Sequence, residues 1–260
     1  LLTLHNHPNS KVPGDYPIAW TKTYGKGKVF YTSLGHREDV WTNREYQEHI
    51  MGGILWSLGL VEGEGSPTDK TFQLAASEKD AGFKRPFNGT DLSGWKLRRE
   101  EGPASWSAQN GMLVNTLKEG EHGTDLISEE KFWNFTVRFE YQVPKASNSG
   151  FYLRGRHEIQ ILEDAAGRKL ADGGNGAIYS IKPVDIFVSR KAGEWQEVEA
   201  TIEGDRVTVF LNGVKVHNQV EVKKATGSEL DTELDQPGPI LLQGDHGAVA
   251  FRNVRIKVLD

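Results

Sequence analysis

The sequence contains no cysteine, and no apolar run approaches the roughly 20 residues that a membrane-spanning helix needs. Without cysteine the chain has neither disulfides nor thiolate metal sites. Basic residues show no excess, because 31 Lys and Arg stand against 36 Asp and Glu and the two signs are mixed along the chain. We therefore expect no membrane span and no nucleic-acid partner.

What is present has the composition of a soluble globular protein, with 37% hydrophobic and 26% charged residues. At 260 residues the chain is longer than most single domains, so one large unit or two smaller ones are expected. It opens with Leu1, Leu2 and Thr3, without an initiator Met or a signal-peptide pattern. We expect it to be part of a longer polypeptide.

Residues 1–60 open with the signals of a hairpin. Residues 18–24 and 29–34 are rich in β-forming side chains and flank a glycine-containing turn. A helical pattern follows, and one hairpin with one helix cannot close a core. We therefore interpret residues 1–60 as the end of a larger domain, and the polar, Gly- and Pro-containing residues 61–82 as a linker.

The helical pattern has a start, a face and a stop. Thr42 and Glu45 form a capping-box pattern, in which each side chain pairs with a free N–H of the first turn. Gly59 is typical of the residue that follows a helix end. A four-residue repeat predicts the buried face of the helix, which comprises Tyr46, Ile50, Ile54 and Leu58.

Residues 83–260 show the pattern of successive strands. The Asn-Gly pairs at 110–111 and 212–213 lie between short β-rich runs, and Asn-Gly is the strongest local signal for a two-residue hairpin. Residues 135–143 alternate apolar and polar side chains, which predicts a strand with one buried face. Short strands without helical patterns between them indicate a β-sandwich or barrel.

Strand alternation sorts the polar residues between 148 and 164. Ile159 and Ile161 share one face, which we predict to be the core face, so Glu158 and Gln160 share the other. In the preceding strand two apolar residues likewise share one face, and Tyr152 and Arg154 share the other. We expect four side chains to lie together on an open sheet face: Tyr152, Arg154, Glu158 and Gln160.

Such a face permits two interpretations. A carboxylate, a guanidinium, an amide and a phenol offer bidentate hydrogen bonds and a ring for stacking, which suits a sugar. The same side chains could instead form a solvated outer face, with an Arg–Glu surface pair that contributes little stability. Strand alternation does not decide between the two.

Ordered short motifs add a family resemblance. Residues 87–95, FNGTDLSGW, resemble the opening of the 3-keto-disaccharide hydrolase domain family, a bacterial lectin-like jelly roll, with Pro86 and Gln196 as departures from its pattern. Later motifs follow in the same order, at 148–162, 176–179, 193–195, 211–213, 238–243 and 246–254. The resemblance implies a mainly β fold over residues 83–260, a concanavalin-like jelly-roll β-sandwich. It also implies a periplasmic or extracytoplasmic location.

Residues 1–60 resemble the C-terminal end of a ThuA-like α/β domain. The resemblance rests on residues 24–32, 34–36 and 53–56. ThuA-like domains are linked to sugar metabolism, so the pairing of the two families implies a sugar-related role.

The larger resemblance implies a hydrolase or lyase that cleaves glycosides or oligosaccharides oxidised to a ketone at C3. That carbonyl acidifies the C2 proton, so a base can remove it and the C1 substituent can depart by elimination, with water adding afterwards. We interpret Glu158 as the base and His246 as a second acid or base. The remaining expected site residues would orient the substrate, stabilise the enolate or line the site: Asn148, Tyr152, Arg154, Gln160, Tyr179 and Gln243.

Two other functions remain open. A non-catalytic carbohydrate-binding module would need the same fold without a tuned acid or base. An ordinary retaining glycosidase is less favoured: Glu158 and Glu163 resemble its carboxylate pair, but Gln160 stands between them as an amide. No cofactor is certain, although Asp164 and Asp172 beside a Gly-containing loop could hold Ca²⁺ or another divalent metal.

Overall fold

The computed structural model describes residues 2–5, 15–61, 74, 76–99, 105–117, 121–164 and 170–260. The chain divides into two compact units, residues 1–70 and residues 71–260. None of the helices in these described ranges is long and apolar enough to cross a membrane.

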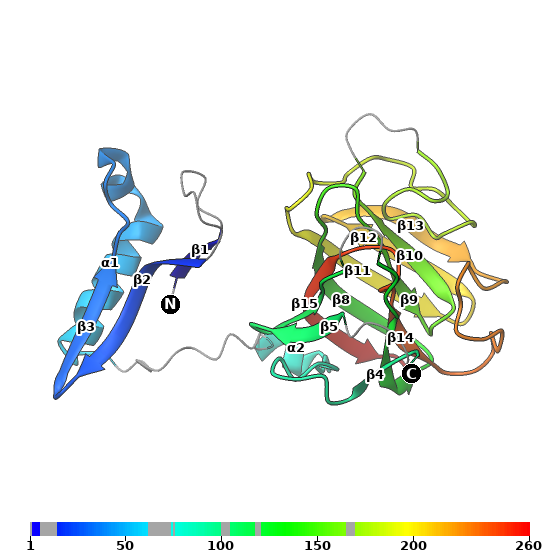
Figure 1. Ribbon diagram of the computed structural model, residues 1–260, viewed down its shortest axis with the longest axis horizontal. Helices are drawn as coiled ribbons and strands as arrows, with labels where there is room; N and C mark the ends of the chain where they lie inside the picture. The colour runs from blue at the N-terminus through cyan, green and yellow to red at the C-terminus, as the bar shows by residue number, and fades with distance from the viewer. Residues whose placement is uncertain are drawn as a thin grey trace. The chain divides into compact units, whose positions relative to one another are not determined.

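The first unit is a small antiparallel sheet with one helix on it (Figure 1). Strands β1 (Leu2–His5), β2 (Asp15–Tyr24) and β3 (Gly27–Thr32) lie in that order, which confirms the predicted hairpin. The 3-10 helix η1 (Glu38–Thr42) precedes α1 (Arg44–Ser57), and α1 contacts β3. Gly53 lies so close to the ring of Phe30 that a Cβ there would come within 2.3 Å of it, so glycine permits the close packing.

Helix α1 differs from its predicted cap and face. Its N-cap is Asn43, whose side chain accepts from the N–H of Tyr46 at 2.9 Å, whereas the Thr42 hydroxyl donates to a backbone carbonyl. Tyr46 is buried, but Ile54 and Leu58 are 44% and 66% exposed. A strict four-residue repeat drifts by about 40° per step around a helix, so its last members leave the face of the first. The predicted stop is confirmed, because Gly59 has φ +72°.

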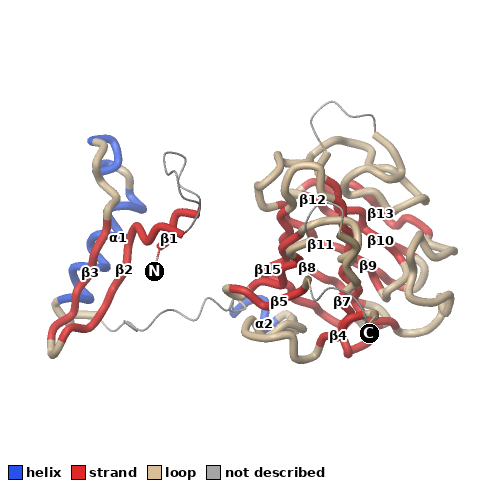
Figure 2. The backbone as a smooth tube through the Cα atoms, viewed as in Figure 1, coloured by secondary structure: helices blue, strands red, loops and turns tan. Residues whose placement is uncertain are grey.

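The second unit is a sandwich of two antiparallel sheets (Figures 1 and 2). One sheet has, in spatial order, β10 (His157–Leu162), β9 (Asn148–Leu153), β14 (Gly238–Leu242), β7 (Leu126–Phe132) and β4 (Trp95–Leu97). The other has β13 (Val214–Glu221), β12 (Arg206–Leu211), β11 (Gln196–Glu203), β8 (Phe135–Gln142), β15 (Val249–Val258), β6 (Met112–Asn115) and β5 (Trp106–Gln109).

One hydrophobic core lies between these sheets, as the predicted mainly β sandwich requires. Strand β8 alternates buried and half-buried residues along its whole length. Phe139 of β8 stacks on Phe151 of β9 with ring centroids 3.9 Å apart, which joins the two sheets at the centre of the core. Both predicted Asn-Gly turns are present: Asn110 and Asn212 have φ of 51°, and each is followed by a glycine with positive φ.

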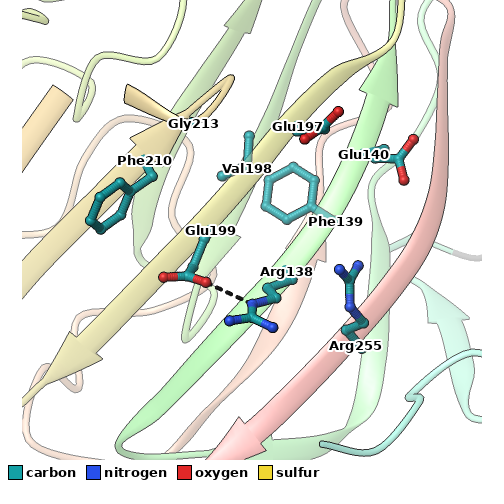
Figure 3. A pocket seen from close by; sticks show the side chains of 9 residues that line it. All are labelled: Arg138, Phe139, Glu140, Glu197, Val198, Glu199, Phe210, Gly213 and Arg255. Atoms are coloured by element: carbon teal, nitrogen blue, oxygen red, sulfur yellow. Dashed lines mark hydrogen bonds and ion pairs between the residues drawn. The ribbon is translucent and has the colours of Figure 1, made fainter. Parts of the chain in front are cut away.

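Part of the predicted linker is structured. Helix α2 (Ala76–Asp80) falls within residues 61–82, and the carboxylate of its Glu78 accepts from Arg138 at 3.2 Å and from Arg255 at 2.6 Å. Both arginines belong to the outer face of the seven-stranded sheet (Figure 3). The end of the predicted linker therefore docks on the sandwich, while 62–73 and 75 lie outside the described residues.

Candidate active site

The candidate site lies on the outer face of the five-stranded sheet. In β9 and β10 the side chains of Phe151 and Ile159 enter the core between the sheets, so those of Tyr152 and Glu158 point to the opposite face. Residues 152 and 158 are direct cross-strand partners in the β9–β10 ladder. Strand alternation therefore places a carboxyl group beside a phenol.

These side chains line a pocket of about 130 Å³ together with residues from three loops. Its lining comprises Asn148, Tyr152, Glu158, Gln160, Tyr179, Gly227, Ser228, Gln243 and His246. Every predicted site residue except Arg154 is among them. The structure thus brings together residues that are up to 98 positions apart in the chain, from 148 to 246.

The placement predicted for Arg154 is wrong. Strand β9 ends at Leu153, and Arg154 has φ +55°, so strand alternation no longer applies to it. Its buried guanidinium donates to the carbonyls of Trp133 at 2.7 Å and Gly204 at 2.8 Å, and lies over the Trp133 ring. Arg154 therefore joins neighbouring turns of the sandwich and does not line the pocket of Glu158.

Glu158 is a buried carboxyl group with a single phenol partner. Its side chain is 3% exposed, and the Tyr152 hydroxyl lies 2.9 Å from its Oε2. Burial raises the pKa of Glu158 to about 8; the Tyr152 hydrogen bond opposes this shift, and the charges of Asp125 and Asp245 add to it. A carboxyl group with a pKa near neutrality can both accept and return a proton.

The Tyr152 hydroxyl has two acceptors and one proton. It lies 2.9 Å from Glu158 Oε2 and 2.8 Å from the carbonyl oxygen of Gly227. When Glu158 is ionised, the hydroxyl can donate to the carboxylate. When Glu158 is protonated, the acid can donate to the Tyr152 oxygen and the hydroxyl can donate to Gly227 instead. Both protonation states of Glu158 are therefore hydrogen-bonded.

Small residues make room for this pair. A Cβ on Gly150 would lie 2.3 Å from Glu158 Oε1 and 2.9 Å from the Tyr152 ring. The backbone of Glu158 is held by Thr226, whose hydroxyl oxygen accepts from the Glu158 N–H at 2.9 Å. Gly150 and Thr226 therefore determine where the carboxyl group sits.

Three amide side chains present unused acceptors. Asn148 Oδ1, Gln160 Oε1 and Gln243 Oε1 are buried and have no hydrogen-bond partner among the described residues. Buried polar atoms are rarely left unpaired, because each costs about 1–3 kcal/mol. A ligand rich in hydroxyl groups would pair with all three.

His246 lies at the rim of the pocket, with its side chain about half exposed. Its Nδ1 is hydrogen-bonded to the carboxylate of the adjacent Asp245. This contact orients the ring and leaves Nε2 available to exchange a proton.

No group of three or more His, Asp or Glu side chains that could hold a metal ion occurs among the described residues. Asp164, a predicted calcium ligand, accepts at its Oδ2 from the Asn175 N–H at 3.4 Å. Residues 165–169, between Asp164 and Asp172, lie outside the described part of the chain. A divalent metal at this loop stays a prediction.

Sequence reasoning missed the loop that forms one wall of the pocket. Gly227 and Ser228 line it, and Thr226 holds the Glu158 backbone, yet residues 222–237 carry no strand or helix pattern. Asp125 and Arg98, which support this loop, also carry no motif. The one available signal is the small pair Gly227-Ser228, which is common to many turns.

A two-sheet sandwich with a polar pocket on one outer sheet face defines the second unit as a lectin-like jelly roll. More specifically, the chain belongs to the family of 3-keto-alpha-glucoside-1,2-lyase-like domains, which matches residues 82–257. Residues 1–57 match the ThuA family, described as trehalose utilisation. Both resemblances found in the sequence are thereby confirmed.

Individual relatives agree with this assignment. A 3-keto-disaccharide hydrolase of Bacteroides thetaiotaomicron is 27% identical over 72% of this chain and 84% of its own length. A crystal structure of a candidate glycosyl hydrolase from Parabacteroides distasonis is 27% identical, with a TM-score of 0.56 over 69% of this chain and 84% of that one. A second such structure from the same organism is 26% identical, with a TM-score of 0.53 over 68% of this chain and 99% of that one.

Proposed function

We propose that the jelly roll cleaves glycosides whose sugar ring carries a ketone at C3, with Glu158 as the base that removes the C2 proton. The observation that carries the proposal is the buried Glu158 carboxyl group, hydrogen-bonded to Tyr152 and faced by three amides with unpaired oxygens. Membership of the 3-keto-alpha-glucoside-1,2-lyase-like family supports the substrate class.

The first step is elimination. The Glu158 carboxylate takes the C2 proton, and the electron pair of the C2–H bond moves into an enolate over C2, C3 and the ketone oxygen. The enolate then restores the ketone and forms a C1=C2 double bond as the C1–O bond breaks. The departing oxygen takes a proton from His246, which lies at the pocket rim where a leaving group would exit.

The second step reverses the proton movements. Water adds at C1 and gives a proton to His246, while Glu158 returns its proton to C2. The net result of the two steps is hydrolysis of the glycosidic bond, and release after the first step would instead make the protein a lyase. Amide N–H groups of the pocket and the Tyr179 hydroxyl are the neutral donors available to the enolate oxygen.

A pH dependence follows from the raised pKa of Glu158. The base is active only when ionised, and its pKa in the folded protein is about 8. We expect kcat/KM to increase with pH up to about 8, over the range in which Glu158 ionises. A profile that is flat from pH 6 to 9 would argue against Glu158 as the base.

The decisive experiment compares a 3-keto-glucoside with its unoxidised parent, using the full chain and chromatography of the released aglycone. We expect release from the keto substrate alone, and a kcat at least about 100-fold lower in Glu158→Gln, as for loss of a general base. Glu163→Gln is the matched control. Glu163 follows β10 but does not line the pocket, so the kcat of this variant should stay near that of wild type.

Other outcomes identify the other functions. Binding of sugar by titration calorimetry without release from either substrate would leave a carbohydrate-binding module. Release from the unoxidised parent that is lost in both variants would indicate a retaining glycosidase. The pocket lining argues against the latter, because Glu158 is the one carboxylate among the described lining residues, whereas that mechanism needs two, about 5–5.5 Å apart.

A further inference from the structure

The loop of residues 226–230 forms a wall of the Glu158 pocket and is held there by its own backbone. Gly227 presents its carbonyl to the Tyr152 hydroxyl, and the N–H of Leu230 donates to the carbonyl of Gly155 at 2.8 Å. Ser228, at the apex, has φ +59°. A segment without helix or strand pairing therefore contacts Tyr152, the hydrogen-bond partner of the proposed catalytic carboxyl group.

Arg98 binds the backbone at the middle of this loop. It follows strand β4, and its Nη1 donates to the carbonyl of Ser228 at 2.8 Å while its Nη2 donates to that of Glu229 at 2.7 Å. Two consecutive carbonyls thus point at one guanidinium, which is a planar fork suited to two acceptors at once.

Asp125 connects the same guanidinium to a second segment of the pocket lining. Its Oδ2 lies 3.1 Å from Arg98 Nη1, and its Oδ1 accepts from the N–H of Gly244 at 3.0 Å. Gly244 follows Gln243 and precedes His246 by two positions, and both of those side chains line the pocket. Arg98 and Asp125 therefore link two segments, 226–230 and 243–246, that both contribute to the lining of the Glu158 pocket.

This pair is partly shielded from water. The side chain of Asp125 is 7% exposed and that of Arg98 is 29% exposed. Neither residue lines the pocket, so neither is placed to touch a substrate. Apart from the ion pair between them, Arg98 and Asp125 contact backbone groups, namely the carbonyls of Ser228 and Glu229 and the N–H of Gly244.

We propose that Arg98 and Asp125 act as positioning residues, which fix the positions of the loop 226–230 and the turn 243–246 beside Glu158. The role rests on the proposed function, because the geometry they fix is that of the proton-transfer site. Arg98 sets the loop that meets Tyr152, and Asp125 sets the turn that carries Gln243 and His246. Loss of the guanidinium should loosen both walls at once.

Arg98→Met and Arg98→Lys test this assignment in the full chain. Methionine keeps the length of the side chain without charge, and lysine keeps the charge without the planar fork. Arg252→Met is the control: Arg252 pairs with Glu140 at 2.6 Å on the outer face of the other sheet, with a side chain 38% exposed.

The first readout is hydrogen exchange of the loop amides, which requires no substrate. The Thr226 and Leu230 N–H groups donate to Arg156 and Gly155, and their exchange should be at least about tenfold faster in Arg98→Met. The second readout is turnover of the 3-keto-glucoside. A fall in kcat of about tenfold or more, with a smaller change in KM, is expected for Arg98→Met but not for Arg252→Met.

The lysine variant separates geometry from charge. If the fork is required, Arg98→Lys should recover less than half of the lost kcat and should still exchange faster than wild type at the loop. Full recovery by lysine, or unchanged exchange in Arg98→Met, would overturn the assignment. Should the methionine variant not fold, the lysine variant carries the same test.

The two proposals fail in different ways. A wild-type protein that releases nothing from the keto substrate contradicts the proposed function, while the exchange data still decide whether Arg98 orders the loop. Turnover that is lost in Glu158→Gln yet unchanged in both Arg98 variants would retain the function and reject the positioning role.

Discussion

Glu158 carries a stability cost that follows from its burial. Its pKa is about 8 in the folded protein against an ordinary 4.5, so the folded state binds the proton more tightly than the unfolded state does. The contribution of Glu158 to stability is therefore most favourable below pH 4.5 and is lost as pH rises from there through about 8. Glutamine at this position cannot ionise and escapes that loss.

We therefore expect Glu158→Gln to be more stable than wild type at pH 9, by an amount on the order of a few kcal/mol, and to show a flatter pH dependence. Urea unfolding of both proteins at pH 5 and pH 9 measures this difference. Glu203→Gln, at an exposed strand end, is the control and should follow wild type. Parallel pH slopes for wild type and Glu158→Gln would contradict a raised pKa.

A substitution at Gly150 tests whether the Glu158 carboxyl group needs the space beside that glycine. In Gly150→Ala the added Cβ would lie 2.3 Å from Glu158 Oε1, so the carboxyl group has to move away from its present position. We expect kcat to fall by roughly 10- to 100-fold, as for a misplaced catalytic group. Gly52→Ala is the control, because a Cβ at Gly52 meets nothing within 4 Å and should leave turnover unchanged.

Unchanged turnover in Gly150→Ala would contradict this expectation. If turnover stays within twofold of wild type, the carboxyl group is not confined by Gly150, and the site has more freedom than the contacts indicate. Folding is checked by thermal unfolding of both glycine variants before kinetics are compared.

At the scale of the element, prediction from sequence succeeded where the signal was local. The outward placement of Glu158 and Gln160 follows from period-two alternation within β10, and each Asn-Gly turn follows from its own two residues. Arg154 failed because a single residue with φ +55° ends that alternation. Alternation cannot reveal where a strand stops.

The loops around the site could not be derived because their positions depend on distant partners. Tyr152 contacts Gly227 across 75 residues, and Arg98 contacts Ser228 across 130 residues. Neither contact leaves a periodic trace in the sequence, since one partner in each is a backbone carbonyl that any residue provides. The pocket walls therefore emerged only from the folded chain.

Helix α2 supports the sandwich through one carboxylate. Glu78 is largely buried and accepts from two arginines of the seven-stranded sheet. We expect Glu78→Gln to lower the free energy of unfolding of the second unit by about 1–3 kcal/mol, because two guanidinium groups lose a shared counter-ion. Glu221→Gln removes the more exposed pair with Arg206 and should cost less than about 1 kcal/mol.

Chemical denaturation of the three proteins at neutral pH decides this comparison. Equal effects of the two substitutions would show that α2 is not part of the folded sandwich. A chain that begins at residue 83 lacks Glu78 and should be destabilised like the Glu78→Gln variant, relative to a chain that begins at residue 71.

At the scale of the whole molecule, the residues of the proposed site all belong to one of the two compact units. The pocket lining begins at Asn148, and its supports reach back to Arg98, so both lie within residues 71–260. The first unit instead exposes several large apolar side chains: Tyr24, Trp41, Met51, Leu58 and Leu60. The described part of the first unit thus contributes none of the residues assigned to the proposed site.

We expect a chain of residues 71–260 to keep kcat/KM within about twofold of the full chain, because every group assigned to proton transfer and to loop positioning is retained. Aglycone release from the 3-keto-glucoside, measured for both chains at equal concentration, tests this expectation. Glu158→Gln in the shorter chain is the control and should abolish release there too. A loss of tenfold or more, in a shorter chain whose unfolding transition is intact, would show that the first unit contributes to the site, and the second unit could no longer be treated as the complete catalyst.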